Sequence, residues 1–173
     1  EDVFVAAIGI RYFDAYEGEQ RLNWRFEKTD VVDIKKDYTY PHYYVGGVFL
    51  RHAVLDELHF DESLSFWEDA LAVNQVIVSQ GKYGLIAGTH YYYRKREDES
   101  SLVDTAWPKK ERYTTLLSSG YGQLFAYSRK KHHRIIPYVQ YMVAYHMRLM
   151  MMKSKQRIIE EILSEEELAA LRD

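Results

Sequence analysis

Residues 60–69, which read FDESLSFWED, place two adjacent carboxylates at the start of a predicted helix. Ser65 and Glu68 have the spacing of a capping box, in which two side chains bond the first free N–H groups of a helix. Apolar residues then recur at helical intervals until Gly81, a residue type that commonly ends helices. The pattern predicts a helix over residues 67–80, with the acidic pair in its first turn.

The acidic pair has two interpretations. The helix dipole favours an anionic side chain in the first turn, so Asp69 would be ionised at neutral pH and available as a general base or as an acceptor for a sugar hydroxyl. Alternatively, Glu68 and Asp69 only cap and charge the end of the helix. The local pattern alone favours this second interpretation.

The segments on either side change that balance. Upstream, residues 45–51 (VGGVFLR) form a predicted strand with two glycines that leads into a short helix. Downstream, residues 91–96 (YYYRKR) form an aromatic strand that ends in arginines. This order closely resembles the second half of glycosyltransferase family 2 enzymes of the GT-A fold. The lead-in FDESL at positions 60–64 is a recurrent phrase of that family, and the resemblance covers residues 45–101.

The resemblance implies a fold and an activity. The fold class is α/β, with part of a GT-A type mixed sheet and its helices followed by an α-helical C-terminal extension. Residues 1–106 would be the C-terminal half of a GT-A glycosyltransferase domain. Residues 107–173 would be the extension, which is loosely similar to helices in capsule and teichoic acid enzymes. The parent enzyme would move a sugar, with inversion, from a nucleotide-sugar donor to a hydroxyl of a cell-surface glycan.

The same resemblance implies roles for the charged residues. The family's acidic pair supplies the catalytic base, so Asp69 would deprotonate the acceptor hydroxyl and Glu68 would position the acceptor or the helix start. Arg94 and Arg96 would neutralise the leaving diphosphate, because guanidinium groups match phosphate oxygens bidentately. Tyr92 shares their face of an extended strand and stands where many relatives carry a metal-binding histidine. A solvated strand end is the open alternative.

The other candidate substrate-binding residues are glycines and aromatic side chains. Gly46 and Gly47 let the backbone pass close to a neighbouring element or to a sugar nucleotide, and the resemblance favours the donor site. Tyr43 and Tyr44 lie just before them in a polar, aromatic loop, where their rings would contact the acceptor. Trp67, next to the acidic pair, is also assigned to substrate binding.

The metal motif of the family is not found in this sequence. Family members begin with a nucleotide-binding βαβ half that ends in an Asp-x-Asp motif. The nearest acidic clusters here, Asp61-Glu62 and Glu97-Asp98-Glu99, lie downstream of the strand that should carry it. We assign no metal ligand, and we expect Mg²⁺ or Mn²⁺ to be held mainly by residues upstream of Glu1 in a longer parent. The chain alone would then be inactive, and residues 97–101 would form a lid over the donor site.

The composition of the chain limits the classes of protein to which it can belong. The chain has 173 residues, is 47% hydrophobic and contains no cysteine, which excludes disulfides and thiolate metal sites and suits a reducing cytoplasm. Its net charge of -3 argues against a nucleic-acid partner. We expect a cytoplasmic location, peripheral at the inner face of the membrane.

One segment is strongly basic. Residues 129–157 contain eight Lys and Arg residues and no Asp or Glu, interleaved with tyrosine and methionine. These helices would lie on an anionic membrane surface or bind a lipid-linked pyrophosphate acceptor. Alternatively, they pack by their apolar face with the basic face in water. The acidic segment 164–171, with a capping box at Ser164 and Glu167, would pair with them.

Residue patterns predict the remaining elements. They are a hairpin of residues 3–15 and 21–26, a strand at 31–34, a loop at 35–44, a short helix at 51–58, strands at 83–87 and 91–94, and helices beginning at Pro108 and Pro137. Two rival functions stay open, namely a non-catalytic module that binds a glycan or a partner, and a membrane-docking adaptor. A βαβ unit ending in Asp-x-Asp upstream of Glu1 would favour the enzyme.

Overall fold

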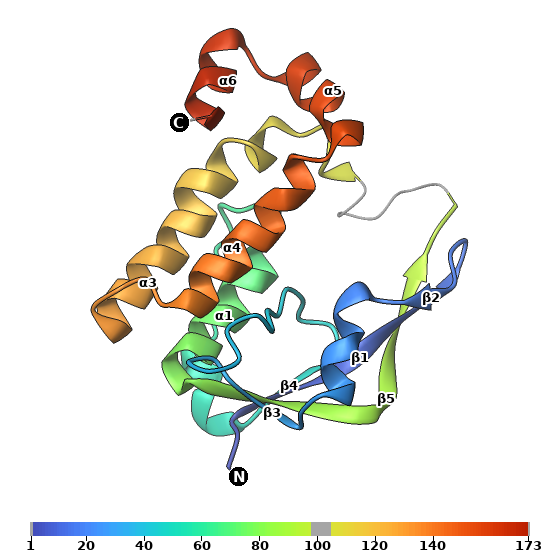
Figure 1. Ribbon diagram of the computed structural model, residues 1–173, viewed down its shortest axis with the longest axis vertical. Helices are drawn as coiled ribbons and strands as arrows, with labels where there is room; N and C mark the ends of the chain where they lie inside the picture. The colour runs from blue at the N-terminus through green and yellow to red at the C-terminus, as the bar shows by residue number, and fades with distance from the viewer. Residues whose placement is uncertain (1, 98–104, 173) are drawn as a thin grey trace.

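The computed structural model describes residues 2–97 and 105–172, apart from the side chains of residues 153–155 and 172. A mixed sheet comes first and a run of helices follows (Figure 1). The strands are β1 (Val5–Asp14), β2 (Gly18–Glu19), β3 (Val31–Asp33), β4 (Val48–Leu50) and β5 (Lys82–Lys95). The short 3₁₀ and π helices are η1 (Arg21–Glu27), η2 (His52–Glu57), η3 (Lys110–Arg112) and η4 (Leu116–Tyr121). The α-helices are α1 (Glu68–Gln80), α3 (Gly122–His132), α4 (Pro137–Met150), α5 (Lys153–Ile162) and α6 (Glu165–Arg172), so the predicted α/β class with C-terminal helices is confirmed.

The strands β1 and β5 form the centre of the sheet. They pair in parallel, whereas β2 and β4 pair with β1, and β3 with β5, in antiparallel fashion. The β1–β5 register shifts after Ile8, near Gly88, whose φ of 78° suits glycine. One continuous strand therefore replaces the two expected at 83–87 and 91–94, because an irregularity absorbs the residues between them.

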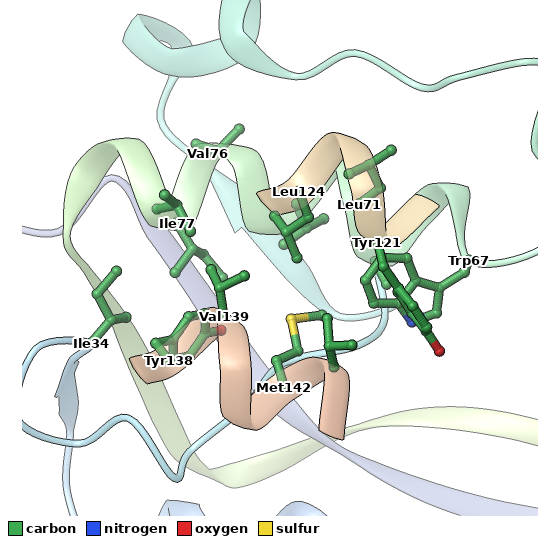
Figure 2. Packing of buried hydrophobic residues seen from close by; sticks show 14 of the residues in the cluster. Ile34, Trp67, Leu71, Val76, Ile77, Tyr121, Leu124, Tyr138, Val139 and Met142 are labelled. Atoms are coloured by element: carbon green, nitrogen blue, oxygen red, sulfur yellow. The ribbon is translucent and has the colours of Figure 1, made fainter. Parts of the chain in front are cut away.

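The hydrophobic core lies where α1 packs between the sheet and the helices α3 and α4. Figure 2 shows Leu71 and Ile77 of α1 close to Leu124 of α3 and to Val139 and Met142 of α4. All five side chains are almost fully buried. The core is thus continuous from the sheet to the helices after residue 107, and the domain boundary expected there stays a prediction.

The prediction that residues 21–26 form the second strand of a hairpin is wrong. Residues 21–27 form the helix η1 and not a strand. The Asn23 side chain takes the place of a strand neighbour, because its Oδ1 accepts the Ile10 N–H at 3.1 Å and its Nδ2 donates to the Ile10 carbonyl at 2.8 Å. The Gln20 side chain caps η1 by accepting the N–H of Leu22. These local bonds satisfy backbone groups that a second strand would otherwise have to pair.

Three of the predicted helix ends are confirmed. Gly81 ends α1 in a left-handed conformation, and Pro137 lies in the first turn of α4. Ser164 and Glu167 form the expected capping box of α6, with bonds of 2.9 Å from the Ser164 N–H and 3.3 Å from the Glu167 N–H. Pro108 does not begin a helix, because it lies in a turn before η3.

The short elements before α1 lie where the sequence predicts them. The strand β3, the loop of residues 35–44 and the helix η2 fall within or close to the expected ranges. In the parts of the chain that the structure describes, no helix combines the length and the apolarity needed to cross a membrane.

Candidate functional site

The start of α1 determines where the acidic pair lies. Trp67, the residue before the helix, has a left-handed φ of 72°, and no side chain of that residue caps the helix. The capping box expected from Ser65 and Glu68 is therefore wrong. The Asp69 carboxylate instead accepts the N–H of Ala70 at 2.7 Å, so Asp69 itself satisfies one of the free N–H groups of the first turn.

Asp69 also connects α1 to the preceding loop. Its Oδ2 accepts the backbone N–H of Val45 at 3.4 Å, and Val45 directly follows Tyr43 and Tyr44. The Asp69 side chain is half-buried. The structure thus brings the predicted base and the predicted acceptor loop together, although they are 24 residues apart in sequence.

Burial is the main influence on the acidity of Asp69. It raises the pKa of the carboxyl group above its usual value, and the charge of Glu68 raises it further, against the hydrogen bonds from Ala70 and Val45. This direction is opposite to the one expected from the helix dipole. A carboxylate with a raised pKa is a stronger proton acceptor, which suits a general base.

Tyr43 and Tyr44 are held in place by hydrogen bonds. The Tyr43 hydroxyl donates to the Met142 carbonyl of α4 at 2.7 Å, and the Tyr43 ring stacks on Tyr145 with the centroids 5.9 Å apart. The Tyr44 hydroxyl accepts a hydrogen bond from Arg25 at 3.3 Å. Burial raises the pKa of both tyrosines, so both hydroxyls are neutral at pH 7. Both rings are therefore fixed in the loop whose next residue, Val45, bonds Asp69.

The two glycines after this loop lie against neighbouring side chains. A Cβ atom on Gly46 would be 2.9 Å from the Tyr91 ring, and one on Gly47 would be 2.8 Å from Ile8 and 2.9 Å from the Tyr91 Cβ. Gly47 also has a φ of 74°, which other residues rarely adopt. Packing on β1 and β5 accounts for both glycines, and their role in donor binding stays a prediction.

The predicted diphosphate-binding residues lie at the far end of β5. The Nε of Arg94 pairs with Asp14 at 2.7 Å on the exposed surface. Tyr92 is 61% exposed on the same face of the strand, and Arg96 is exposed just after the strand ends. Sequence reasoning missed Arg11, which the parallel register places beside Tyr92. No signal in the sequence could have found it, because the register depends on the irregularity near Gly88.

These residues are separate from the acidic pair. Among the described residues, no contact joins Arg94 to Asp69. Tyr91, which covers Gly46, precedes Arg94 by three residues, a distance of about 10 Å along a strand. The site therefore has a carboxylate part at α1 and a separate cationic part at the end of β5.

Trp67 is part of the core. Its side chain is 4% exposed, and its ring packs edge-on against Tyr121 with the centroids 5.0 Å apart. Its assignment to substrate binding stays a prediction.

Within residues 2–97 and 105–172, no three His, Asp or Glu side chains are placed to hold a metal ion. Residues 98–101 of the expected lid lie outside the described residues.

The chain is similar to two proteins of Bacillus subtilis (strain 168). It is 39% identical over 169 residues to the minor teichoic acid biosynthesis protein GgaA, in an alignment that covers 96% of this chain and 38% of GgaA. It is 32% identical over 145 residues to the minor teichoic acid biosynthesis protein GgaB, covering 82% of this chain and 16% of GgaB. The chain therefore spans less than two fifths of the length of either relative. No family model matches the chain, and no solved structure matches it.

Proposed function

We propose that this chain is the acceptor-side part of a longer glycosyltransferase of family 2, with a GT-A fold, that acts in teichoic acid biosynthesis. The observation that carries the proposal is the position of Asp69. It is a half-buried carboxylate with a raised pKa at the start of α1, held by the loop of Tyr43 and Tyr44. The names of the two Bacillus relatives support the cell-wall context.

In this mechanism Asp69 removes a proton from the acceptor hydroxyl as the reaction proceeds. The acceptor oxygen forms a bond to the anomeric carbon of the donor sugar, and the bond from that carbon to the nucleoside diphosphate breaks. The proton ends on the Asp69 carboxylate, the bonding electrons leave with the diphosphate, and attack opposite the leaving group inverts the anomeric centre. Glu68 helps by raising the pKa of Asp69.

The leaving diphosphate would contact the cationic part of the site. Arg94 and Arg96, with Arg11 near Tyr92, supply guanidinium groups on or next to one exposed face of the sheet. Arg94 would have to exchange its exposed ion pair with Asp14 for a phosphate oxygen, and such exposed pairs are weak, about 0–1 kcal/mol.

A divalent ion, Mg²⁺ or Mn²⁺, would neutralise diphosphate charge in the whole enzyme. The described residues do not supply a set of ligands for it. We therefore propose that its ligands, together with the nucleotide-binding strands, belong to another part of the longer protein. This is also why we expect residues 1–106 to be only part of a transferase domain.

The basic segment 129–157 is proposed to contact an anionic acceptor or membrane surface. Met151 and Met152 at the end of α4 are 69% and 46% exposed, and Arg148 is exposed one turn earlier. Exposed apolar side chains next to cations are typical of segments that lie on anionic lipid. The acidic helix α6 makes an ion pair between Glu167 and Lys110, and none joins it to the described side chains of residues 129–157.

Calorimetric titration with several nucleotide sugars and Mn²⁺ tests the proposal. The 173-residue chain should show no micromolar binding, because two or three arginines cannot replace a metal and a diphosphate cradle. A longer protein that also contains the upstream region should bind one donor. Micromolar binding by the chain alone would place the donor site within these residues, and failure of the longer protein to bind any nucleotide sugar would contradict a transferase.

A further inference from the structure

A buried cation that has no counter-ion among the described residues lies against Phe66, just before the acidic pair. Arg112, at the end of η3, is 3% exposed. Its Nε and Nη1 groups are buried and have no hydrogen-bond partner among the residues that the structure describes. No described carboxylate pairs with it. Buried arginines are normally paired or fully hydrogen-bonded, because a desolvated charge without partners strongly disfavours the folded state.

Aromatic rings cover the two faces of this guanidinium group. The Arg112 Cζ lies 4.1 Å from the centroid of the Phe66 ring and 3.9 Å from that of the Trp107 ring. Cation–π contacts of this kind stabilise the charge from above and below. They leave the N–H groups in the guanidinium plane without acceptors, and those groups carry the hydrogen-bonding capacity of arginine.

Arg25 shows how this chain satisfies a buried arginine elsewhere. Arg25 is fully buried, and its Nε donates to the Leu22 carbonyl at 2.9 Å. Its Nη groups donate to the Pro41 carbonyl and to the hydroxyls of Tyr83 and Tyr44. Arg112, which is 3% exposed, lacks such a set of acceptors among the described residues.

A further hydrogen-bond donor without a partner belongs to the same cluster of rings. The Trp67 Nε1 is buried and has no partner within the described part of the chain. His146 lies between Phe66 and Trp67, with ring centroids 5.9 and 5.8 Å away, and its Nδ1 is 2.6 Å from the Tyr121 hydroxyl. Burial, followed by the charge of Arg112, lowers the pKa of His146 to about 3, so its ring is neutral. The Tyr121 hydroxyl and the His146 Nδ1 therefore satisfy each other.

The unpaired groups are therefore donors, and what they lack is an acceptor with negative charge. From this we infer that Arg112, with Trp67, forms a binding site for an oxyanion of the phosphate class. Phe66 and Trp67 immediately precede Glu68 and Asp69, so a bound phosphate would lie next to the start of α1. Arginine binds phosphate bidentately, and the aromatic walls exclude water from the contact.

Two sources of phosphate are compatible with this position. One is the diphosphate of a nucleotide-sugar donor, and the other is a phosphate group of the acceptor. The choice between them rests on the proposed function, whereas the anion site rests only on the unpaired donors. A binding measurement therefore separates a failure of this inference from a failure of the transferase proposal.

The test is a thermal unfolding series on the 173-residue chain in potassium chloride, and in inorganic pyrophosphate at the same ionic strength. Pyrophosphate should raise the melting temperature of the wild type, because a ligand that binds only the folded state stabilises it. Arg112→Met should be at least as stable as the wild type in chloride and should lose the pyrophosphate response. Arg129→Met, which removes an exposed arginine of α3, should keep the response.

A titration followed by tryptophan fluorescence gives a second measurement, since Trp67 and Trp107 are in the site. Arg112→Lys keeps the charge and loses the bidentate geometry, so its Kd for pyrophosphate should be at least tenfold weaker. This variant decides the question if Arg112→Met does not fold. A response to UDP would indicate the donor as the source, and one to glycerol 1-phosphate the acceptor. Equal pyrophosphate responses in the wild type and the Arg112 variants, or none in the wild type, would overturn the inference.

Discussion

Two opposing effects act on Asp69. Burial and the adjacent charge of Glu68 favour the protonated carboxyl, while the N–H groups of Ala70 and Val45 favour the ionised form. Because the balance raises the pKa, the group accepts a proton more readily than an ordinary aspartate. The same balance means that the ionised side chain weakens the fold at neutral pH.

Replacing Asp69 by Asn should therefore stabilise the chain at pH 7. A folded-state pKa above the unfolded value of 3.8 means that the folded chain binds more protons than the unfolded one between the two pKa values, so stability falls as pH rises through that window. Asn carries no charge and keeps a carbonyl that can accept the Ala70 N–H. Urea unfolding across pH should show the advantage of Asp69→Asn at pH 7 and its disappearance below pH 3.8.

Glu68→Gln is the matched control for this prediction. It removes a neighbouring charge that also raises the Asp69 pKa, so it should give a smaller gain at neutral pH with the same dependence on pH. If Asp69→Asn were less stable than the wild type at pH 7, the hydrogen bonds to the carboxylate would outweigh its burial.

At the scale of elements, the sequence predicts what depends on neighbours along the chain. The helix after the acidic pair, its end at Gly81 and the capping box of Ser164 and Glu167 all follow from local spacing. The predictions fail where a residue distant in the sequence supplies a hydrogen bond that the local pattern does not show. Asn23 bonds to the backbone of Ile10, and the segment expected as a strand becomes the helix η1.

Gly81 offers a clean test of how α1 ends. Its φ is 77°, and a Cβ atom there would meet nothing within 4 Å, so a substitution tests backbone strain alone. Gly81→Ala should destabilise the chain by about 1 kcal/mol or slightly more, since alanine disfavours the left-handed region. Gly81→Asn should cost clearly less, because asparagine tolerates this conformation. Equal losses in urea unfolding would show that something other than the backbone angle matters.

The candidate site could be predicted from the sequence only in part. The resemblance pointed to Asp69 and the residue pattern pointed to the loop of Tyr43 and Tyr44, and the structure places the loop and Asp69 together. It could not indicate that Arg94 would be bonded to Asp14, or that Arg11 would lie beside Tyr92, because both depend on how β1 pairs with β5. The unpaired donors of Arg112 could not be predicted from the sequence either, because burial is a property of the fold.

At the scale of the whole molecule, the sheet has exposed apolar side chains. Phe49 of β4 and Ile86 of β5 are 57% and 46% exposed, on the same face of the sheet as the exposed Tyr91. Exposed apolar area of this kind commonly marks a surface that contacts another structure. We propose that the nucleotide-binding half of the longer enzyme packs against it, bringing a donor between the arginines of β5 and Asp69.

The central claim is that Asp69 is the catalytic base of that enzyme. The most direct test is the rate of sugar transfer by the longer protein with Asp69→Asn, measured at saturating donor and acceptor. The rate should fall on the order of a hundredfold or more for loss of a general base, while Glu68→Gln should have a milder effect. Circular dichroism should show an unchanged fold in both variants. Near-normal transfer by a folded Asp69→Asn enzyme would remove Asp69 from the mechanism and contradict the proposed function of this site.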